Sequence, residues 1–528
     1  MSVTRWLKSL PYLALLGMTG VVGWWLGRAP QTPERKTIVD EVTEITVKPP
    51  AQLKLEVLPT EVEMSRAQMP DQSRERLVAF PDRESFDDFL REGASGVEII
   101  SSDDALLTAR VRYDRGSQIG RHIGSGDVLV NSEQKRPRLP DGGVQPGAVG
   151  FGGQLLDWLG IADRPLSWGE GVTVAIVDSG VTDHPTFQTE IVEIEIRDNT
   201  QTPEVGHGTA VASLIAGAHP QAAGIAPSAR LISIPVTNTE GTSDTFTVAQ
   251  AIVAAVDAGA SFVNLSLGGE PSPVLNRAIE YANAAGVVLI AATGNDGLSR
   301  LNSPASHPGV YSVGSIDGRS NLLDFSSRDF ADINAPGLAI NAAFPGEKLV
   351  RASGTSMSAP IVLGAAAAYQ SMHPEVTPVQ AIESVLRFAG DAGPAGVDQA
   401  YGGGEIDFPA LLNNGSPNYE NLAVSGVYYE ANSSGSRAGE MVTVYQNRGT
   451  EIISGAEVSV TGDIANTTFA VGTLVPGATT SFRFPVSSEF TQRSEGFQMQ
   501  TEIKAPPGRS DAFLRDNTRD FQFTPRTP

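Results

Sequence analysis

The chain has 528 residues, no cysteine and a formal net charge of −22 at pH 7. Its length allows two to four domains of about 100–200 residues each. The lack of cysteine excludes disulfides, thiolate zinc sites and a thiol nucleophile. The acidic balance argues against nucleic-acid binding, because phosphate contacts need clustered Lys and Arg.

The N-terminal segment, residues 1–29, is predicted to be a signal-anchor or a signal peptide. Arg5 and Lys8 precede the uncharged run Leu10–Gly27, which is near the minimum length for a membrane-spanning helix. We favour an uncleaved anchor, because Pro30 follows the one small-residue stretch that offers a cleavage site. A cleaved signal peptide and a buried core helix are the alternatives.

Between this segment and the next apolar pattern lie a linker and a small folded unit. Residues 30–75 are rich in Pro, Glu, Thr and Gln, which is typical of a linker. Residues 76–113 favour a β-α-β-β unit whose helix begins after Asp82. The expected strands are Leu77–Phe80, Val97–Ile100 and Leu106–Val111. Such a unit is too small to be very stable alone. Residues 114–150, with repeated Gly, Pro and basic residues, predict an exposed loop or processing region.

Residues 151–412 have the pattern of an α/β domain. Near-continuous apolar, β-branched runs alternate with helical segments, which indicates a parallel sheet between layers of helices. The strand-like runs are GVTVAIVD, ARLISIPV, SFVNLSLGG and VVLIAATGN, and the helical segments are HGTAVASLIAG, TVAQAIVAAVDAGA and SPVLNRAIEYANAAG. A later helix near residues 376–390 is predicted to begin with a capping box made by Thr377 and Gln380.

The period changes to two after residue 415. Short alternating segments such as MVTVYQNRGT, AEVSVTGD and TTSFRFPV are separated by turn residues at intervals of roughly ten. This pattern predicts a β-sandwich over residues 418–524.

Four polar residues of the α/β domain lie where strands end or helices begin. Asp178 and Asn295 follow strand-like runs, and His207 and Ser356 open helical segments. Each alone has an ordinary structural explanation as a turn, a cap or a buried polar residue. Ligands of parallel sheets bind at the carboxyl ends of the strands, so we expect the four to converge there. A serine nucleophile needs a base, the base needs an orienting carboxylate, and the intermediate needs oxyanion donors.

The stretch GTSMSAPIVLGAAAA, which starts at Gly354, allows two explanations. Thr355 or Ser356 is expected to cap the helix, with Pro360 in the first turn, where a missing N–H costs little. A serine at a helix N-terminus also lies where backbone N–H groups and the helix dipole favour negative charge. That second property suits a hydroxyl that attacks a carbonyl.

The chain from about 165 to 410 resembles the subtilisin family of serine proteases. The motifs that carry the resemblance are VAIVDSG, HGTAVASLIAG, NLSLGG, AATGND and GTSMSAP, and the order Asp, His, Ser is the order of this family. The resemblance implies a subtilisin-like parallel sheet between helices. It implies that Ser356 is the nucleophile, His207 the general base and Asp178 its orienting carboxylate. Asn295 and the N–H of Ser356 would form the oxyanion hole.

The resemblance also implies where a polypeptide substrate binds. The SLG strand would pair with the substrate backbone, and a second small-residue segment would help to wall the first specificity pocket. The substrate-binding residues implied are Ser266, Leu267, Gly268, Ala291, Ala292, Thr293 and Gly294.

The chain departs from the family pattern in one loop, and it has one additional segment on each side of the matched region. The loop AGAHPQAAG lacks the Asn-rich calcium ligands of some members, so no calcium site is expected there and no metal residue is predicted. Structural calcium is not indicated by the sequence, but calcium elsewhere stays open, and the chemistry is expected to need no cofactor. The unit 76–113 resembles a truncated propeptide. Residues 418–524 resemble bacterial Ig-like adhesion modules, for which a surface ligand is the expected partner.

We therefore expect a serine endopeptidase whose protease domain lies outside the cytoplasm, membrane-anchored through the N-terminal helix or secreted if that segment is cleaved. Polypeptides are the expected substrates. The alternatives are a catalytically inactive subtilisin-like scaffold, and a surface adhesion protein in which proteolysis serves only self-processing.

Overall fold

The computed structural model describes residues 54–55, 75–113, 126–135, 144–196, 206–431, 438–493 and 496–523, apart from the single positions 95, 146 and 239. The chain divides into two units, 1–50 and 51–528, and every described residue belongs to the second. The predicted N-terminal membrane segment lies outside the described residues. Within the described ranges, no helix is long and apolar enough to cross a membrane.

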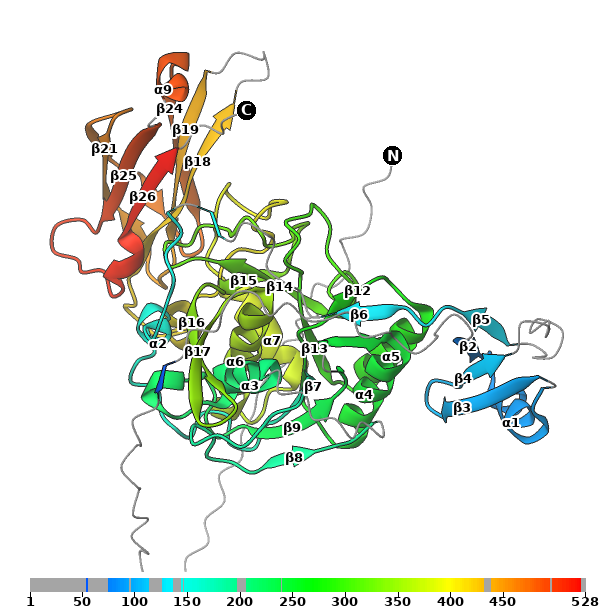
Figure 1. The fold of residues 1–528 in the computed structure, drawn as a ribbon. Coiled ribbons are helices and arrows are strands. Elements are labelled where there is room, and N and C mark those ends of the chain that lie inside the picture. Colours follow the sequence, from blue (N-terminus) through cyan, green and yellow to red (C-terminus); the bar gives the residue numbers. More distant parts are fainter. Residues whose placement is uncertain are drawn as a thin grey trace, which may run out of the picture. The chain divides into compact units, whose positions relative to one another are not determined.

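A seven-stranded parallel sheet forms the centre of residues 151–412, which we call the central domain (Figure 1). Its strands, in spatial order, are β15 (Ile333–Pro336), β14 (Tyr311–Ile316), β13 (Val288–Ala292), β11 (Phe262–Leu265), β7 (Thr173–Asp178), β9 (Arg230–Pro235) and β8 (Ile191–Glu193). The middle strands are apolar and buried, as expected for a sheet with both faces covered. The predicted parallel sheet is confirmed.

Helices cover both faces of this sheet (Figure 1). One hydrophobic cluster lies between the sheet and the helices on its first face, and a second cluster lies between the sheet and the helices on its other face. On the first lie α3 (His207–Ala216), α6 (Thr355–Met372) and α7 (Pro378–Arg387); on the second lie α4 (Thr245–Asp257) and α5 (Pro273–Ala284). The capping box of Thr377 and Gln380 at the start of α7 is confirmed in both of its hydrogen bonds.

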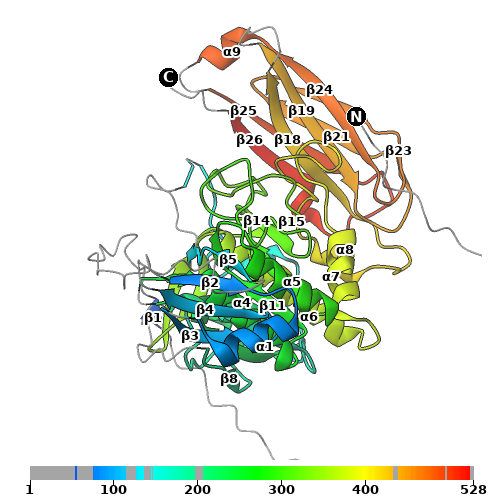
Figure 2. The same cartoon turned by 90° about the vertical axis from the view of Figure 1, so that its right-hand side faces the viewer.

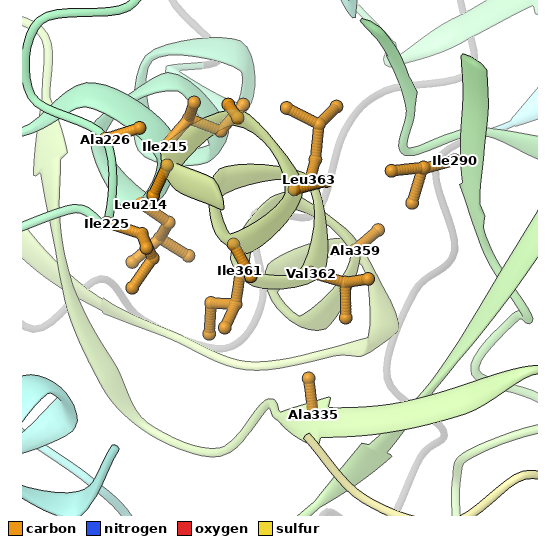
Figure 3. Close-up of a cluster of buried hydrophobic side chains, with 14 of the residues drawn as sticks. Leu214, Ile215, Ile225, Ala226, Ile290, Ala335, Ala359, Ile361, Val362 and Leu363 are labelled. Atoms are coloured by element: carbon orange, nitrogen blue, oxygen red, sulfur yellow. The ribbon is translucent and has the colours of Figure 1, made fainter. Parts of the chain in front are cut away.

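Helix α6 is buried along its first fourteen residues. Figure 3 shows its side chains Ile361, Val362 and Leu363 pointing to different sides of the helix, toward neighbours from α3, the following loop and the sheet. A helix that is apolar all round must be enclosed in a core. Gly364 permits the closest approach, since a Cβ there would lie 2.8 Å from Ile225 Cβ.

Shorter elements surround the central sheet. The strands β16 (Ile340–Phe344) and β17 (Lys348–Ala352) form a hairpin, and β1 (Lys54–Leu55) pairs in parallel with β17. A second small sheet has the order β10-β6-β12, with β10 at Thr242–Asp244, β6 at Glu133–Lys135 and β12 at Gly268–Gly269. The remaining helices are α2 (Leu155–Trp158), η3 (Pro220–Ala222) and α8 (Phe408–Leu412).

The N-terminal unit is a four-stranded antiparallel sheet with one helix (Figure 2). Its elements are β2 (Glu75–Ala79), α1 (Arg83–Glu92), β3 (Val97–Asp103), β4 (Thr108–Tyr113) and β5 (Asp127–Leu129). Asp82 caps α1 by accepting a hydrogen bond from the N–H of Ser85, as predicted. Phe80, Phe86 and Phe89 form its small core.

The described part of residues 418–523, which we call the C-terminal module, consists of strands, two short helical segments and the loops between them. One antiparallel sheet has the order β18-β19-β24 and another the order β22-β21-β25-β26, and residues from both share one hydrophobic cluster. The elements are β18 (Leu422–Ala431), β19 (Gly439–Asn447), β20 (Ile453–Ser454), β21 (Glu457–Gly462), β22 (Thr467–Ala470), β23 (Thr473–Leu474), β24 (Thr479–Val486), α9 (Ser488–Gln492), β25 (Phe497–Lys504), η4 (Leu514–Asn517) and β26 (Thr518–Phe523).

The structure differs from the sequence prediction in the two predicted linkers. β1 lies inside residues 30–75, and β5 and β6 lie inside residues 114–150, so neither segment is entirely loop. These strands have two or three residues each, too few for an alternating pattern. Their conformation comes from the partner strands, which supply the hydrogen bonds.

Candidate active site

The site lies at the carboxyl ends of the central strands. β7 ends at Asp178, and the loop after β13 holds Asn295. Two helices begin at the same edge: α3 starts with His207 after Gly206, and α6 starts with Thr355 after Gly354. Both glycines have positive φ, 61° and 131°, which allows the sharp entry into each helix. The topology therefore brings two strand ends and two helix N-termini to one edge.

Asp178 and His207 are in direct contact. His207 Nδ1 lies 2.8 Å from Asp178 Oδ1 and 2.9 Å from Oδ2. The carboxylate is fully buried, whereas 14% of the His207 side chain is exposed. The N–H of Ser179 donates to Asp178 Oδ1 at 2.7 Å, which fixes the carboxylate further. Because a buried carboxylate accepts from Nδ1, the other ring nitrogen, Nε2, is the one available for proton transfer.

Ser356 is the second residue of α6 and is 2% exposed. Pro360, four residues later, has no N–H, so it cannot make the usual helical bond to the carbonyl of Ser356. The hydroxyl of Ser266, which follows β11, donates to that carbonyl at 3.1 Å instead. The side-chain amide of Asn264 donates to the Ser266 hydroxyl at 2.9 Å. Two residues of the central sheet thus hold the backbone of Ser356.

Asn295 is tied to the start of the same helix. Its Oδ1 accepts from the N–H and from the hydroxyl of Thr355, both at 2.9 Å. A Cβ at Gly354 would lie 2.9 Å from Asn295 Nδ2 and 3.2 Å from Ser356 Oγ. The amide nitrogen and the serine hydroxyl therefore flank the same glycine, whose missing side chain leaves space between them.

The predicted helix start was wrong in detail. Neither Thr355 nor Ser356 caps α6, because Gly354 occupies the cap position and Pro360 lies in the second turn rather than the first. The hydroxyl of Thr355 bonds to Asn295 instead. The sequence showed Thr355 only as a possible cap, and no local motif pointed to its contact with a residue sixty positions away.

The predicted substrate-binding residues divide into two groups. Ser266, Leu267, Ala291, Ala292 and Thr293 are at most 1% exposed, whereas Gly268 is partly exposed. Leu267 and Ala291 belong to the cluster beneath α4 and α5. Gly294 has positive φ and borders Asn302 Nδ2, which would lie 2.3 Å from a Cβ there.

A strand lies along the Gly268 edge. Lys135 and Gln134 of β6 pair antiparallel with Gly268 and Gly269 on one side and with β10 on the other. The side chain of Gln134 is fully buried, and its amide donates to the carbonyl of Glu270 at 3.3 Å. The sequence analysis missed Gln134 and Glu270, because neither carries a motif.

Other kinds of site lie apart from this edge. In the part of the chain that the structure describes, no group of three His, Cys, Asp or Glu side chains is placed to hold a metal ion. A cavity of about 490 Å³ lies at the boundary with the C-terminal module, lined by residues that include Arg387, Tyr419 and Arg448. It contains none of the residues described above.

Comparisons with known proteins identify relatives of the central domain. Residues 169–404 match the model of the subtilase family, peptidase S8. Subtilisin BL of Lederbergia lenta is 33% identical over 247 residues, which cover 46% of this chain and 91% of that protein. Thermitase of Thermoactinomyces vulgaris is 36% identical over 215 residues, 38% of this chain and 77% of that protein.

A solved structure of the prenylagaramide maturation protease PagA is 33% identical, with a TM-score of 0.42, and the match covers 46% of this chain and 93% of that one. The family match and the subtilisin relative together identify the central domain and its fold. The chain belongs to the subtilase family and is a subtilisin-like serine peptidase.

Proposed function

We propose that the protein is a serine endopeptidase that cleaves polypeptides through an acyl-enzyme, with Asp178, His207 and Ser356 as its triad. The observation that carries this proposal is the bond between His207 Nδ1 and the buried carboxylate of Asp178, at the same sheet edge as the N-terminus of α6. A buried carboxylate on Nδ1 holds the imidazole in the tautomer whose Nε2 accepts a proton.

In the proposed mechanism, Ser356 Oγ attacks the scissile carbonyl and its proton passes to His207 Nε2. The negative oxygen of the tetrahedral intermediate accepts hydrogen bonds from Asn295 Nδ2 and the N–H of Ser356. His207 then gives the proton to the leaving amine, and the acyl group stays on Ser356. A water molecule, deprotonated by His207, attacks the acyl carbon, and Ser356 leaves with the proton. These steps use protein groups and water alone, so we propose that the chemistry needs no cofactor.

A fluorophosphonate probe tests the nucleophile directly. We expect the wild-type protein to be labelled and to hydrolyse casein, and Ser356→Ala to do neither while it keeps the wild-type unfolding temperature. Ser358→Ala is the matched control, because it removes a neighbouring buried hydroxyl of α6 that bonds to the carbonyls of Ala335 and Pro336. Labelling of Ser356→Ala would refute the assignment, and a wild type that stays unlabelled after release of its N-terminal part would indicate an inactive scaffold.

Substrates are proposed to bind as an extended strand between β10 and β12. The support is β6, a segment of the chain itself that pairs with both. Backbone pairing of this kind accepts many sequences, because the main chain supplies the hydrogen bonds. The proposed substrate-binding residues are Ser266, Leu267, Gly268, Ala291, Ala292, Thr293 and Gly294.

We further propose that the N-terminal unit and β6 together inhibit the central domain until they are released. The unit contacts α5 through Arg277, whose guanidinium donates to the carbonyls of Phe80 at 3.1 Å and Leu106 at 3.0 Å. Leu77 and Leu106 belong to the hydrophobic cluster of the central domain rather than to the unit's own core. β6 meanwhile occupies the proposed substrate cleft.

The variant Arg277→Ala tests this inhibition in the full chain. Loss of the guanidinium leaves two carbonyls of the unit without their donor, so we expect faster appearance of casein hydrolysis after purification. Arg230→Ala, an exposed arginine at the start of β9, is the control and should activate at the wild-type rate. Equal rates for both variants would support a spacer role for the unit.

The remaining proposals concern location and the C-terminal strands. We propose export of the central domain, with residues 1–29 as the anchor or signal, and a β-sandwich for the C-terminal module. Sequencing of the mature N-terminus, together with membrane fractionation of cells, tests whether this segment is retained.

A further inference from the structure

The C-terminal module contacts the central domain through a buried group of charged residues. Arg448, in the turn after β19, is the centre of this group, and its side chain is 4% exposed. Its guanidinium lies 3.1 Å from a carboxylate oxygen of Glu405 and 3.5 Å from one of Asp407, both in the central domain. It lies 3.5 Å from Asp516 of the module's own η4. Two central-domain carboxylates therefore enclose an arginine of the module.

The surroundings of Arg448 fit its guanidinium closely. It donates to the carbonyl of Asp391 at 2.8 Å and to the side chain of Gln446 at 3.1 Å. A Cβ at Gly390 would lie 2.3 Å from Arg448 Cζ, so only glycine leaves room for the guanidinium at that position. These contacts fit the planar guanidinium of an arginine in one orientation. The ammonium group of a lysine could not make all of them.

Three further contacts lie around this centre. Arg519 of β26 lies 3.8 Å from Glu405. The guanidinium of Arg515 lies 3.9 Å from the ring centroid of Trp158, in α2 of the central domain. A Cβ at Gly160 would lie 2.8 Å from the ring of Phe513. The module therefore contacts both the end and the beginning of the central domain.

The two backbones also meet directly. The N–H of Gly393 donates to the carbonyl of Ser425 at 3.2 Å. A Cβ at Gly426 would lie 2.1 Å from the carbonyl oxygen of Gly393. A side chain at residue 426 would not fit here, so glycine at this position allows the two backbones to lie this close. A tilt of the module away from this position would break the contact.

The segment around Glu405, which contacts the C-terminal module, is paired with the central sheet. Glu405 pairs with Asn334 of β15, an edge strand, and the Asn334 side chain donates to the carbonyl of Gly404 at 2.9 Å. A buried ion pair adds little net stability after desolvation, but its removal on one side leaves uncompensated buried charge. Ionic contacts of this kind fix an orientation more than they add affinity.

We propose that the C-terminal module is a fixed brace of the central domain, docked in one orientation that Arg448 sets, and not a mobile binding domain on a linker. This proposal is independent of the proposed catalytic mechanism, because its test uses no activity measurement.

The test uses the full chain and its lack of cysteine. Cysteines introduced at two exposed positions, Glu280 on α5 and Thr467 on β22, carry spin labels, and double electron–electron resonance gives their distance distribution. The Ser356→Ala background limits self-digestion. We expect one narrow distribution, and in calorimetry one shared unfolding transition of the module and the central domain.

Two variants disturb the junction in different ways. Arg448→Met removes the cation between Glu405, Asp407 and Asp516 and leaves Arg519 beside Glu405 alone. Gly426→Ala places a methyl group against the Gly393 carbonyl without a change in charge. We expect both to broaden the distance distribution and to lower Tm by roughly 5 °C or more. If Arg448→Met does not fold, Gly426→Ala alone decides the result.

Matched controls lie elsewhere in the module. Arg483→Ala removes an exposed arginine paired with Glu430 and Glu440, and Gly472→Ala adds a methyl group where nothing lies within 4 Å. Both should keep the narrow distribution and a Tm within about 2 °C of the parent. A broad distribution in the parent protein, or junction variants that behave like these controls, would overturn the proposal.

Discussion

The hydroxyl of Ser266 donates a hydrogen bond to the carbonyl of Ser356 across 3.1 Å. This bond exists because Pro360 removes the N–H that would bond to the same carbonyl within the helix. Ser266, at a strand end of the central sheet, therefore supplies the missing donor, and the side-chain amide of Asn264 donates to Ser266 in turn. The carbonyl of Ser356 is therefore hydrogen-bonded by a residue next to the sheet instead of by its own helix.

Ser266→Ala should consequently affect both stability and turnover. The buried carbonyl of Ser356 loses its donor, so we expect the free energy of unfolding to fall by about 1–3 kcal/mol. We expect kcat to fall, because the backbone of the proposed nucleophile, Ser356, is less firmly held. Chemical denaturation and steady-state kinetics on a peptide substrate measure these effects.

Ser371→Ala is the control for this prediction. It removes a hydroxyl that bonds to the carbonyl of Ala368 and the N–H of Gly169, near the far end of the same helix. It should lower stability and leave kcat unchanged. A wild-type kcat in Ser266→Ala would mean that the bond to Ser356 is only structural.

Asn295→Ala should lower kcat by about 100–1,000-fold with little change in KM, the size that loss of one oxyanion donor has in a subtilisin. The change also frees the N–H and hydroxyl of Thr355. Thr355→Val separates the two effects, because it loses the hydroxyl and keeps the Asn295 amide. We expect only a small decrease in kcat for Thr355→Val. If Asn295→Ala raised KM and left kcat unchanged, Asn295 would be a substrate-binding residue instead.

Gly269→Ala should hinder strand pairing in the cleft. A Cβ there would lie 2.6 Å from the carbonyl oxygen of Glu133 and 2.8 Å from Gln134 Nε2, so β6 cannot keep its present position. We expect slower self-cleavage, followed by gel electrophoresis, and a higher KM for peptides that pair with the same edge. Gly472→Ala, in open space, should behave as the wild type, and normal self-cleavage of Gly269→Ala would contradict the role of β6.

The junction with the C-terminal module should weaken in alkali. Burial raises the pKa of Asp516 to about 8, although the positive charge of Arg448 acts to lower it. The negative charges of Asp407 and Asp511 raise this pKa further, and the positive charge of Arg515 lowers it. The folded state therefore favours the protonated acid, and this contribution to stability is present at low pH and lost as the pH rises through about 8. We expect Tm to fall from pH 7 to pH 9 by more in the wild type than in Asp516→Asn.

Calorimetry at both pH values measures this difference. Asp520→Asn, which changes an exposed acid on β26 of the same module, is the control and should keep the wild-type pH dependence. The same pH dependence in Asp516→Asn as in the wild type would show that another group is responsible.

The sequence was most informative where one local pattern decides a structure. The capping box of Thr377 and Gln380 needs only residues three positions apart, and the prediction of α7 from it is confirmed. The parallel sheet followed from apolar runs that are buried on both faces. The association of Asp178 with His207 followed from the rule that ligand sites lie at strand ends, because both residues sit where that rule applies.

Structure that depends on distant partners escaped prediction. β6 is polar and three residues long, and its conformation comes from hydrogen bonds to β10 and β12, more than a hundred positions away. The cap of α6 was assigned to a hydroxyl residue, since such residues usually cap helices. Asn295 engages that hydroxyl instead, and glycine takes the cap position.

The parallel pairing of β1 with β17 has a consequence for the release of the N-terminal part of the chain. A fragment that ended just after β6 would contact the central domain at three places: β1 beside β17, Phe80 and Leu106 beside Arg277, and β6 between β10 and β12. Because the three contacts belong to one fragment, a contact that dissociates stays close to its partner at a high effective concentration. It therefore rebinds before the other two contacts dissociate. A single cut would leave such a fragment in place as a multivalent ligand, and dissociation would become fast only after a second cut separates its attachments.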